Sequence, residues 1–260
     1  MKEKIRRLEE LLSARAPLLV AYSGGVDSTC LLAVARRVLG DSVMGVIADS
    51  PSLPRRSLAD ALAVAATLGA TVEVIATQEF DIEQYTSNPP NRCYFCKAEL
   101  FSQMDALARK RGFSAIAYGE NADDPAHLRP GSKAAEEFAV LAPLREAGLT
   151  KADVRALSAS CELPTAEAPA QPCLSSRIPY GTVVTREALG LIERGEEAVR
   201  ALGFRVFRVR YLAPSGARVQ IAPDEMHSLT GLRERVCDGL RKVGFGVVEI
   251  DPKGYRAPSA

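Results

Sequence analysis

The first 120 residues alternate short apolar runs with segments of helical periodicity, and this alternation restricts the fold more than any other feature of the chain. Strands are expected at residues 17–22, 42–48, 71–76 and 113–119, and helices at 28–39, 54–68 and 92–111. Apolar strands that alternate with helices typically form a parallel sheet that is covered on both faces. The sequence therefore predicts an α/β domain, whose ligands bind at the carboxyl ends of the strands.

The remainder of the chain has a different pattern. Residues 121–184 are rich in proline, which interrupts regular elements, and one helix is expected there at about 150–161. Helices are then expected at 185–202 and 224–243, a hairpin of strands 204–211 and 217–221, and a last strand at 245–250. We expect a first domain at residues 1–172 and a smaller α+β domain at residues 173–260.

Composition excludes several classes of protein. Two histidines, His127 and His227, are too few for a multi-histidine metal centre, and six cysteines are too few for a disulfide scaffold in 260 residues. The net charge of +1 gives no general indication of nucleic-acid binding, so no nucleic-acid partner is expected. The charge is unevenly divided, with −3 before residue 173 and +4 from there on.

The amino-terminal segment is charged and amphipathic, and it lacks the apolar core and cleavage site of a signal peptide. No run of apolar residues approaches the length of a membrane span, so no membrane partner is expected. We therefore expect a cytoplasmic protein, in which cysteines are thiols or metal ligands.

The segment SGGVDS follows the first expected strand and opens the first expected helix. Its glycines let backbone N–H groups approach an anion, its serines add hydroxyl donors, and the helix N-terminus favours negative charge. Asp27 is suited to hold Mg²⁺ rather than a phosphate. An ordinary glycine-rich turn is the alternative, because the segment lacks the lysine of a Walker A loop. The predicted ATP-binding residues of this segment are Ser23, Gly24, Gly25, Val26, Asp27 and Ser28.

This segment resembles the SGGxDS motif of the PP-loop ATP pyrophosphatase superfamily, which has an adenine nucleotide alpha hydrolase-like fold. The resemblance implies that ATP is split to AMP and pyrophosphate as a substrate carboxylate or carbonyl oxygen is adenylated, with Asp27 as a catalytic residue. It also implies a loop facing ATP or Mg²⁺ after the fourth strand, where Asn121 and Asp124 lie. Asp49 ends the second strand, a position suited to the nucleoside. A solvated turn is the alternative at each of these places.

The cysteines form two groups. Cys93 and Cys96 are three residues apart at the start of an expected helix, and Cys173 lies between proline-rich loops. Three thiolates fit a [4Fe–4S] cluster with one open iron better than a closed zinc site. A redox-active C-x-x-C pair and simple packed thiols are the alternatives. The other three lie in apolar helical patterns and are expected in the core: Cys30, Cys161 and Cys237.

Together these features resemble the LarE family, ATP-dependent sulfurtransferases that make the nickel-pincer nucleotide, the cofactor of lactate racemase. The similarity covers nearly the whole chain and rests on six segments: SGGVDS (23–28), NRCYFCK (91–97), NADD (121–124) with RPG (129–131), AGLTK (147–151), CLSSRIPYGT (173–182) and FRVR (207–210). The segment 173–182 is the most specific of these, because the phosphate loop also occurs in NAD synthetases, GMP synthetases and tRNA thiolases.

The resemblance implies a definite reaction. ATP and Mg²⁺ would adenylate a carboxylate of pyridinium-3,5-biscarboxylic acid mononucleotide, and a sulfur nucleophile would then form the thiocarboxylate. In some members the cysteine at the position of Cys173 gives up its own sulfur. In others three cysteines hold a [4Fe–4S] cluster that carries an extra sulfide. Cys93, Cys96 and Cys173 are all present, which favours the cluster. A homo-oligomer, often a hexamer, and contact with other enzymes of cofactor biosynthesis are also compatible with the family.

A substrate with a phosphate and two carboxylates requires basic anchors. Arg208 and Arg210 alternate along an expected strand and therefore project from the same face. Ser176 and Arg177 lie beside Cys173 and are further candidates for substrate binding. The alternative for Arg208 and Arg210 is an ordinary solvated strand face.

Two other functions are compatible with parts of the pattern. A PP-loop tRNA sulfurtransferase also uses ATP and can use three cysteines, but the modest charge and the segment 173–182 count against it. A non-catalytic nucleotide-binding module would need only the fold, and the presence of Asp27 with both loop serines counts against that hypothesis.

Overall fold

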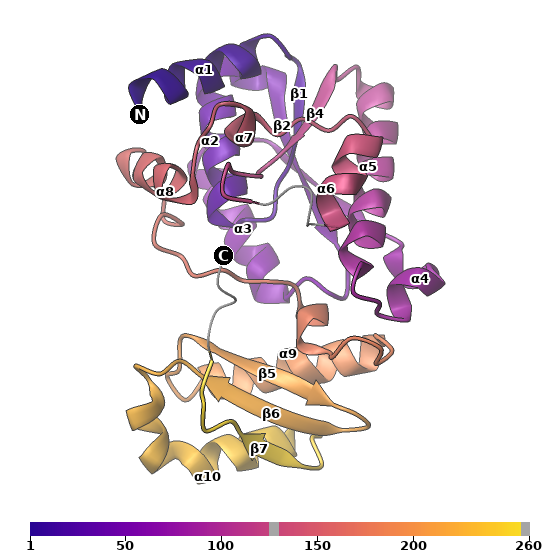
Figure 1. Cartoon of the computed structure of the whole chain (residues 1–260), viewed down its shortest axis with the longest axis vertical. Helices are drawn as coiled ribbons and strands as arrows, with labels where there is room; N and C mark the ends of the chain where they lie inside the picture. Colours follow the sequence, from indigo (N-terminus) through magenta and orange to yellow (C-terminus); the bar gives the residue numbers. More distant parts are fainter. Residues whose placement is uncertain (125–129, 256–260) are drawn as a thin grey trace. The chain divides into compact units, whose positions relative to one another are not determined.

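The computed structural model describes residues 1–124 and 130–255, which form two compact units (Figure 1). Of the described residues, the first unit contains 1–82 and 91–168 (without 125–129), and the second contains 83–90 and 169–255. His127, and Arg129 of the segment RPG (129–131), lie outside the described residues. No helix in the described part of the chain is long and apolar enough to span a membrane.

The first unit contains a four-stranded parallel sheet, which confirms the predicted fold class. Its strands lie in the order β3 (Val72–Ala76), β2 (Val43–Asp49), β1 (Leu18–Ala21) and β4 (Ala115–Tyr118). The helices of this unit are α1 (Lys2–Ser13), α2 (Val26–Leu39), α3 (Arg55–Thr67), α5 (Arg92–Arg111), α6 (Pro130–Glu137), α7 (Pro143–Glu146) and α8 (Lys151–Ser160).

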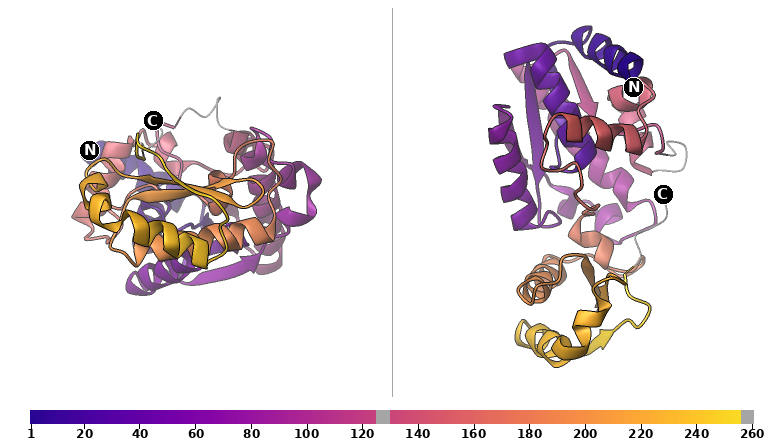
Figure 2. Two further views of the ribbon diagram at one scale, coloured as in Figure 1. Left: turned by 90° about the horizontal axis from the view of Figure 1, so that it is seen from below. Right: turned by 90° about the vertical axis from the view of Figure 1, so that its left-hand side faces the viewer.

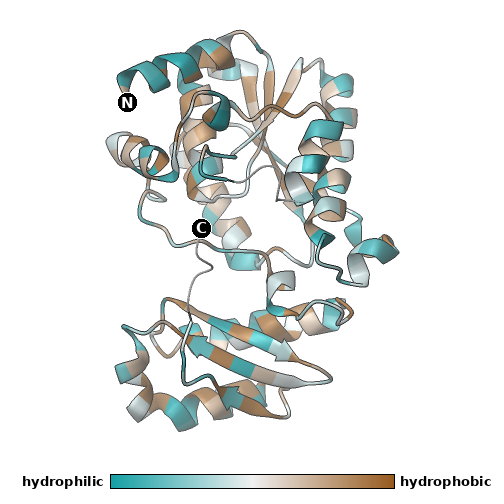
Figure 3. Ribbon diagram, viewed as in Figure 1, coloured by the Kyte–Doolittle hydropathy of each residue, from teal (hydrophilic) through white to brown (hydrophobic). Residues whose placement is uncertain are grey.

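Helices cover both faces of this sheet because alternate strand residues point to opposite sides. Leu18 and Val20 pack with α1, α2, α3 and α8, whereas Leu19 packs with α5 and α6. Helices lie on both sides of the strands in Figure 1, and Figure 2 shows the same unit from two further directions. The strands of this sheet are coloured largely as hydrophobic in Figure 3. Burial on both faces explains why the strands appear as nearly continuous apolar runs in the sequence.

The strand order places a binding site at the end of β1. Helix α2 packs on one face of the sheet and connects β1 to its neighbour β2. Helix α5 packs on the opposite face and leads to β4, which is the neighbour of β1 on its other edge. Loops therefore diverge at the carboxyl end of β1, and a crevice forms there in open parallel sheets.

The interpretation of residues 121–184 as loops with a single helix was incomplete. Helices α6 and α7 also lie in this stretch. Helix α6 (PGSKAAEE) buries the small side chains Ala134 and Ala135 against α5, so its sequence shows little apolar periodicity. Helix α7 begins with Pro143, which a first helical turn tolerates because its N–H needs no partner there.

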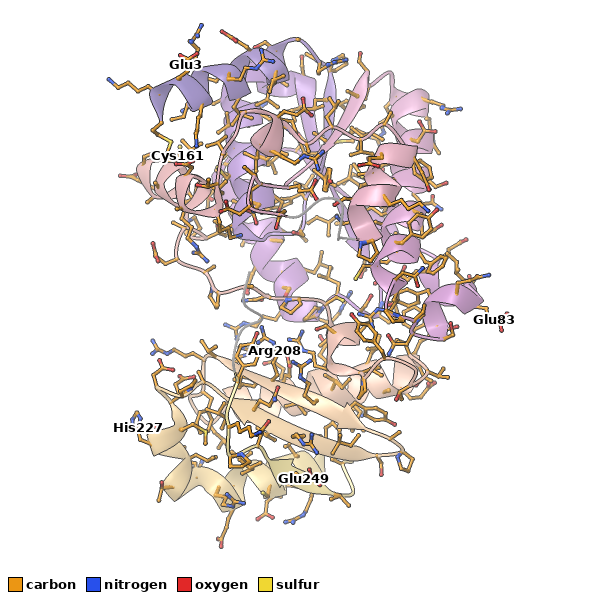
Figure 4. All side chains as sticks on the ribbon, in the orientation of Figure 1. Glu3, Glu83, Cys161, Arg208, His227 and Glu249 are labelled. Carbon is orange, nitrogen blue, oxygen red and sulfur yellow. The ribbon has the colours of Figure 1, made fainter. Side chains whose placement is uncertain are left out.

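The second unit confirms the small α+β architecture. Helix α9 (Arg186–Arg200) precedes the antiparallel hairpin of β5 (Phe207–Leu212) and β6 (Gly216–Ile221), and α10 (Met226–Lys242) connects β6 to β7 (Val248–Ile250). The order is β5-β6-β7, with β7 parallel to β6. Side chains of α9, α10 and one sheet face form the core, while the opposite sheet face carries polar residues, among them Arg208 on β5 and Glu249 on β7 (Figure 4).

Candidate functional site

The phosphate loop lies between β1 and α2, as the sequence predicts. Gly24 has φ +74°, and a Cβ there would come within 2.7 Å of the Ala61 Cβ, so both conformation and space require glycine. The Ser23 and Ser28 hydroxyls share a hydrogen bond of 3.1 Å, and Ser28 Oγ donates to the Gly25 carbonyl at 3.1 Å. The loop is thus shaped by its own side chains around the N-terminus of α2.

The end of β4 lies directly against this loop. A Cβ at Gly119 would come within 2.7 Å of the Ser28 nitrogen, so only glycine allows the two backbones to approach so closely. This contact places residues 120–124 beside Asp27, and Asn121 Nδ2 donates to Asp27 Oδ1 at 3.2 Å. Asp124 Oδ2 accepts from the Asn121 backbone at 3.2 Å and so shapes this loop. The structure therefore brings Asn121 to the phosphate loop, while Asp124 contacts the loop of Asn121 itself.

A lysine from α8 completes the surroundings of Asp27. Lys151 Nζ lies 2.5 Å from Asp27 Oδ2, and the Lys151 backbone N–H donates to Asp123 Oδ2 at 2.8 Å. In the sequence, Lys151 is indicated only as the last residue of the family segment AGLTK (147–151), without a role of its own. Its 124-residue separation from Asp27 left no local signal of the ion pair.

A cavity of about 250 Å³ opens beside the loop. Its lining combines the loop with apolar side chains from β2 and α5 and one cation: Ala21, Tyr22, Ser23, Gly25, Asp27, Ser28, Ile47, Ala48, Leu53, Lys97, Leu100, Phe101, Tyr118 and Gly119. A lining that combines the backbone N–H and hydroxyl groups of the loop with apolar side chains suits a nucleotide. Asp49 is not among these lining residues, and its carboxylate pairs with Arg55 at 2.6 Å.

Glu120, which follows the cavity-lining Gly119, is buried and bonded to three side chains. Its carboxylate accepts hydrogen bonds from the Tyr118 and Ser132 hydroxyls and forms an ion pair of 2.6 Å with Arg145. Burial, together with Glu120, raises the pKa of Tyr118, so the phenol stays protonated and keeps donating. Lys97 Nζ lies 4.5 Å from the centre of the Tyr118 ring, so this network supports the wall from which Lys97 enters the cavity. Local sequence patterns do not indicate this network, because Ser132 and Arg145 reach Glu120 from separate helices, α6 and α7.

Cys93 and Cys96 lie in the first two turns of α5, as predicted. Cys93 is exposed and Cys96 is half-buried, and their spacing places them on one side of the helix. Between them, the Tyr94 hydroxyl donates to Glu137 Oε2 of α6 at 2.6 Å. This bond links the first turn of α5 to α6 beside the two cysteines.

Cys173 is exposed and belongs to the second unit, immediately before a short 3-10 helix (Leu174–Arg177). Arg177 is 3% exposed and forms a bidentate ion pair with Glu196 of α9, at 2.8 and 3.1 Å. Its remaining bonds go to the carbonyls of Pro172 and Cys173 and to the Ser176 hydroxyl. Arg177 therefore holds the backbone of Cys173 in place.

Residues 83–90 are bonded to the same loop. Buried Asn88, with φ +57°, donates from Nδ2 to the carbonyls of Pro179 at 2.8 Å and Thr182 at 2.9 Å. The Tyr85 and Ser175 hydroxyls share a hydrogen bond of 2.8 Å. The segment that ends three residues before Cys93 is thus attached to the loop that begins at Cys173, a relation that sequence patterns did not indicate.

Arg208 and Arg210 project from the same face of β5. Arg208 Nη2 donates to the Ala170 carbonyl at 2.8 Å, and Arg210 Nη1 donates to the Ser176 carbonyl at 2.7 Å. Burial and then the charge of Arg177 lower the pKa of both arginines, while the guanidinium of Arg208 stacks 4.5 Å from the Tyr255 ring centre. The guanidinium groups of Arg177, Arg208 and Arg210 thus lie near a single carboxylate, that of Glu196. The resulting excess of positive charge suits an anion.

The donor residues can be compared with what Mg²⁺ and an iron–sulfur cluster each require. No three His, Cys, Asp or Glu side chains gather as a metal-binding group within residues 1–124 and 130–255. Mg²⁺ fits nevertheless, because it is commonly held by one carboxylate, here Asp27, together with substrate phosphates. The thiols of Cys93, Cys96 and Cys173 have the donor chemistry for an iron–sulfur cluster, although they come from both units.

The remaining cysteines are at or near the cores. Cys30 is fully buried, as predicted, and burial raises the pKa of its thiol to about 12. Cys161 is half-buried against the core of the first unit, and Cys237 is half-buried on α10. Burial therefore keeps the Cys30 thiol protonated at neutral pH, which makes it unsuited to nucleophilic chemistry.

Comparison with known proteins gives one family and several relatives. Residues 8–127 match the NAD synthase family. The chain is 39% identical over 260 residues to the uncharacterized protein slr1717 of Synechocystis, covering 99% of this chain and 96% of that protein. It is 33% identical over 239 residues to the pyridinium-3,5-bisthiocarboxylic acid mononucleotide synthase of Lactiplantibacillus plantarum, covering 92% and 86% of the two chains. It is 28% identical over 240 residues to the uncharacterized protein MJ0830 of Methanocaldococcus jannaschii, covering 92% and 91%.

Proposed function

The chain belongs to the LarE family, that of the pyridinium-3,5-bisthiocarboxylic acid mononucleotide synthase of L. plantarum, and we propose that it is an ATP-dependent sulfurtransferase acting on pyridinium-3,5-biscarboxylic acid mononucleotide. The observation that carries the proposal is the meeting of the phosphate loop, Asn121 and Lys151 around Asp27 in a chain that also presents exposed Cys173. The product would be the corresponding thiocarboxylate, a step in nickel-pincer nucleotide synthesis.

The first unit would bind ATP. Backbone N–H groups at the start of α2, with Ser23 and Ser28, would donate to phosphate oxygens, and the apolar walls of the cavity would hold the base. Asp27 would hold Mg²⁺ with the phosphates, and the ion would supply charge neutralisation for the leaving pyrophosphate. Glu120 would act indirectly, by supporting the wall that carries Lys97.

The second unit would hold the substrate. Its phosphate and two carboxylates require cations, and Arg208 and Arg210 present guanidinium groups on one strand face. Ser176 lies beside them, since its carbonyl accepts from Arg210 and its hydroxyl from Arg177. Arg177, saturated by its own contacts, would position the Cys173 loop. We propose the division of labour predicted from the sequence, with residues 1–172 for ATP and 173–260 for substrate and for contacts in a homo-oligomer, such as a hexamer.

The chemistry proceeds in two stages. A substrate carboxylate oxygen attacks the α-phosphorus of ATP, the bond to the bridging oxygen breaks, and pyrophosphate leaves with the electron pair. A sulfur nucleophile then attacks the acyl carbon, and AMP leaves. A soft nucleophile needs no general base at this step, which suits a site without histidine among its described residues.

The sulfur has two candidate sources. Cys93, Cys96 and Cys173 would hold a [4Fe–4S] cluster, which supplies an expendable sulfide when bound. Alternatively, the Cys173 thiolate would itself form a thioester. Loss of the Cys173 α-proton and cleavage of its Cβ–S bond would then leave dehydroalanine and release the thiocarboxylate. The presence of all three cysteines favours the first source.

The test is an incubation of the purified, anaerobic protein with Mg–ATP and the biscarboxylate mononucleotide. We expect substrate-dependent AMP and pyrophosphate, and a product in which one carboxylate oxygen is replaced by sulfur. Asp27→Ala should lower AMP formation by about 100-fold or more, because a preorganised charged group is lost. Asp60→Ala, which changes an exposed carboxylate on α3, is the matched control. Tight, salt-dependent binding of bulk tRNA without AMP formation from the mononucleotide would contradict the proposal.

The same preparation distinguishes the sulfur sources. Iron and acid-labile sulfide that are lost in Cys93→Ser, Cys96→Ser and Cys173→Ser variants would support the cluster. Conversion of Cys173 to dehydroalanine after one turnover, seen by mass spectrometry, would support the sacrificial source.

A further inference from the structure

The side chain of Lys97 rests on a strand and a helix before it reaches the cavity. Lys97 lies in the second turn of α5 and is among the residues that line the cavity. Its ammonium group lies 4.5 Å from the ring centre of Tyr118, the last residue of β4. The end of the same side chain lies against Gly131 of α6. We call these two contacts, with Tyr118 and with Gly131, the Lys97 seat.

Gly131 is required by space and not by backbone conformation. It belongs to the segment RPG (129–131), to which the proposed function gives no role. Gly131 is buried in α6 and does not have a positive φ. A Cβ at this position would come within 2.6 Å of Lys97 Cδ, 2.9 Å of Cε and 3.0 Å of Nζ, and these are its three nearest atoms. The absent side chain therefore leaves room for the end of Lys97.

One carboxylate connects the two parts of the Lys97 seat. Glu120 accepts a hydrogen bond from the Tyr118 hydroxyl and another from the hydroxyl of Ser132, the residue after Gly131. Its ion pair of 2.6 Å with Arg145 compensates the negative charge. Glu120 is buried, so water competes little for these bonds. Glu120 therefore holds the Tyr118 ring in place relative to the start of α6.

Both parts of the Lys97 seat are uncharged. An aromatic ring attracts an ammonium group through its electron-rich face, and a glycine contributes only close packing. A carboxylate in their place would also hold the lysine, but it would cancel the positive charge and repel an anionic ligand. Packing against the seat also restricts the rotamers of a flexible side chain before a ligand binds, which lowers the entropy cost of binding. The seat therefore orients the cation without cancelling its charge.

We propose that Tyr118 and Gly131 are positioning residues, which act through Lys97 and direct its ammonium group toward the nucleotide in the cavity. This inference rests on the proposed use of ATP. Neither residue takes part in the transfer of a proton or the breaking of a bond. Tyr118 supplies the ring face, Gly131 supplies the space for the end of the side chain, and Glu120 keeps the two in register.

The first test is Gly131→Ala, which adds a methyl group where the end of Lys97 lies. In calorimetric titrations of Mg–ATP into the full-length protein, binding should weaken roughly 10-fold, as is typical when a hydrogen bond to a charged group is lost. The midpoint of thermal unfolding should not fall, because alanine favours a helix more than glycine does. Gly231→Ala is the matched control and should bind as the wild type does, since a Cβ at this glycine of α10 would meet nothing within 4 Å.

A double-mutant cycle with Lys97→Ala shows whether the effect passes through Lys97. This variant removes the atoms that the methyl group would displace, so Gly131→Ala should cause no further loss of Mg–ATP affinity in that background. A general structural role of Gly131 would instead lower the affinity equally in both backgrounds. That result would overturn the proposal, and so would wild-type affinity in the Gly131→Ala variant alone.

Substitution of Tyr118 tests the ring independently of Gly131. Tyr118→Phe keeps the ring face and should retain most of the Mg–ATP affinity, whereas Tyr118→Leu should weaken binding about two- to five-fold. The loss in the leucine variant should disappear in the Lys97→Ala background. Its persistence there would show a direct contact between the ring and the nucleotide and would overturn the positioning role of Tyr118. A wild-type protein that does not bind Mg–ATP would contradict the proposed use of ATP itself.

Discussion

The two units hold positive charge in opposite ways. In the first unit, Lys151 reaches the phosphate loop through one ion pair and stays partly exposed. In the second unit, Arg177 is buried, makes five hydrogen bonds, and fixes the backbone around Cys173. A cation with one ion pair can exchange it for a ligand, whereas a cation with five hydrogen bonds to its own chain is part of the structural framework. Proximity to a site therefore does not by itself make an arginine a ligand-binding residue.

The largest expected effect distinguishes these two cations by stability. Arg177→Met leaves the carboxylate of Glu196 buried without its ion pair, so the free energy of unfolding should fall by about 3–5 kcal/mol. Lys151→Met removes an ion pair that is partly exposed, and the cost should stay below about 1 kcal/mol. Urea unfolding of the two variants beside the wild type measures both. Equal losses would show that the comparison is mistaken.

A smaller effect is expected where the second unit presents charge to a ligand. Tyr255→Leu removes the ring on which Arg208 stacks, and binding of the biscarboxylate mononucleotide should weaken about two- to five-fold, or about 0.5–1 kcal/mol. Tyr255→Phe keeps the ring and should bind almost as the wild type does. Titration of substrate into each variant provides the measurement. Weaker binding by the phenylalanine variant as well would assign the role to the hydroxyl instead.

The smallest effect concerns Asp153, which forms the cap of helix α8 together with Thr150. The Lys4 ammonium, and then the bonds from Thr150, lower the pKa of Asp153 to about 2. The folded state therefore keeps this carboxylate charged to lower pH than the unfolded chain does, because an aspartate in the unfolded chain has a pKa of about 3.9. The stabilisation is present above that pH and is lost as the pH falls through about 2.

Asp153→Asn measures this contribution. The urea midpoints of the variant and the wild type should differ at neutral pH and converge as the pH falls from about 4 to about 2. A difference that is constant over that range would show that Lys4 and Thr150 do not act through the charge of Asp153.

Much of the first unit could be predicted from short patterns. Its strands are buried on both faces and its glycine-rich turn lies between a strand and a helix, so local sequence carries the signal. Helix α6 was missed because it packs through small alanines. The attachment of residues 83–90 to the loop after Cys173 depends on Asn88. Its hydrogen-bond partners Pro179 and Thr182 are more than 90 residues away along the chain, so local patterns carry no signal of it.

Some residues of the candidate site could likewise be identified from local sequence, whereas the roles of others depend on contacts between distant segments. Ser23–Ser28 and the three cysteines of NRCYFCK and CLSSR could be identified from residue type and spacing. Lys97, Lys151 and Glu120 could not be assigned roles, because a lone lysine or glutamate has the same local pattern whether it faces solvent or a nucleotide. Their partners are set by which strands and helices become neighbours.

By itself, the sequence determined the parallel sheet, the place of the phosphate loop in it, and the thiol chemistry available to the protein. These features are written in periodicities of two and 3.6 residues and in the conformational freedom of glycine. Only the tertiary structure decided that Lys151 faces Asp27 and that Arg177 supports Cys173. Such contacts follow from the order of strands and the faces on which helices pack, and these depend on the whole chain at once.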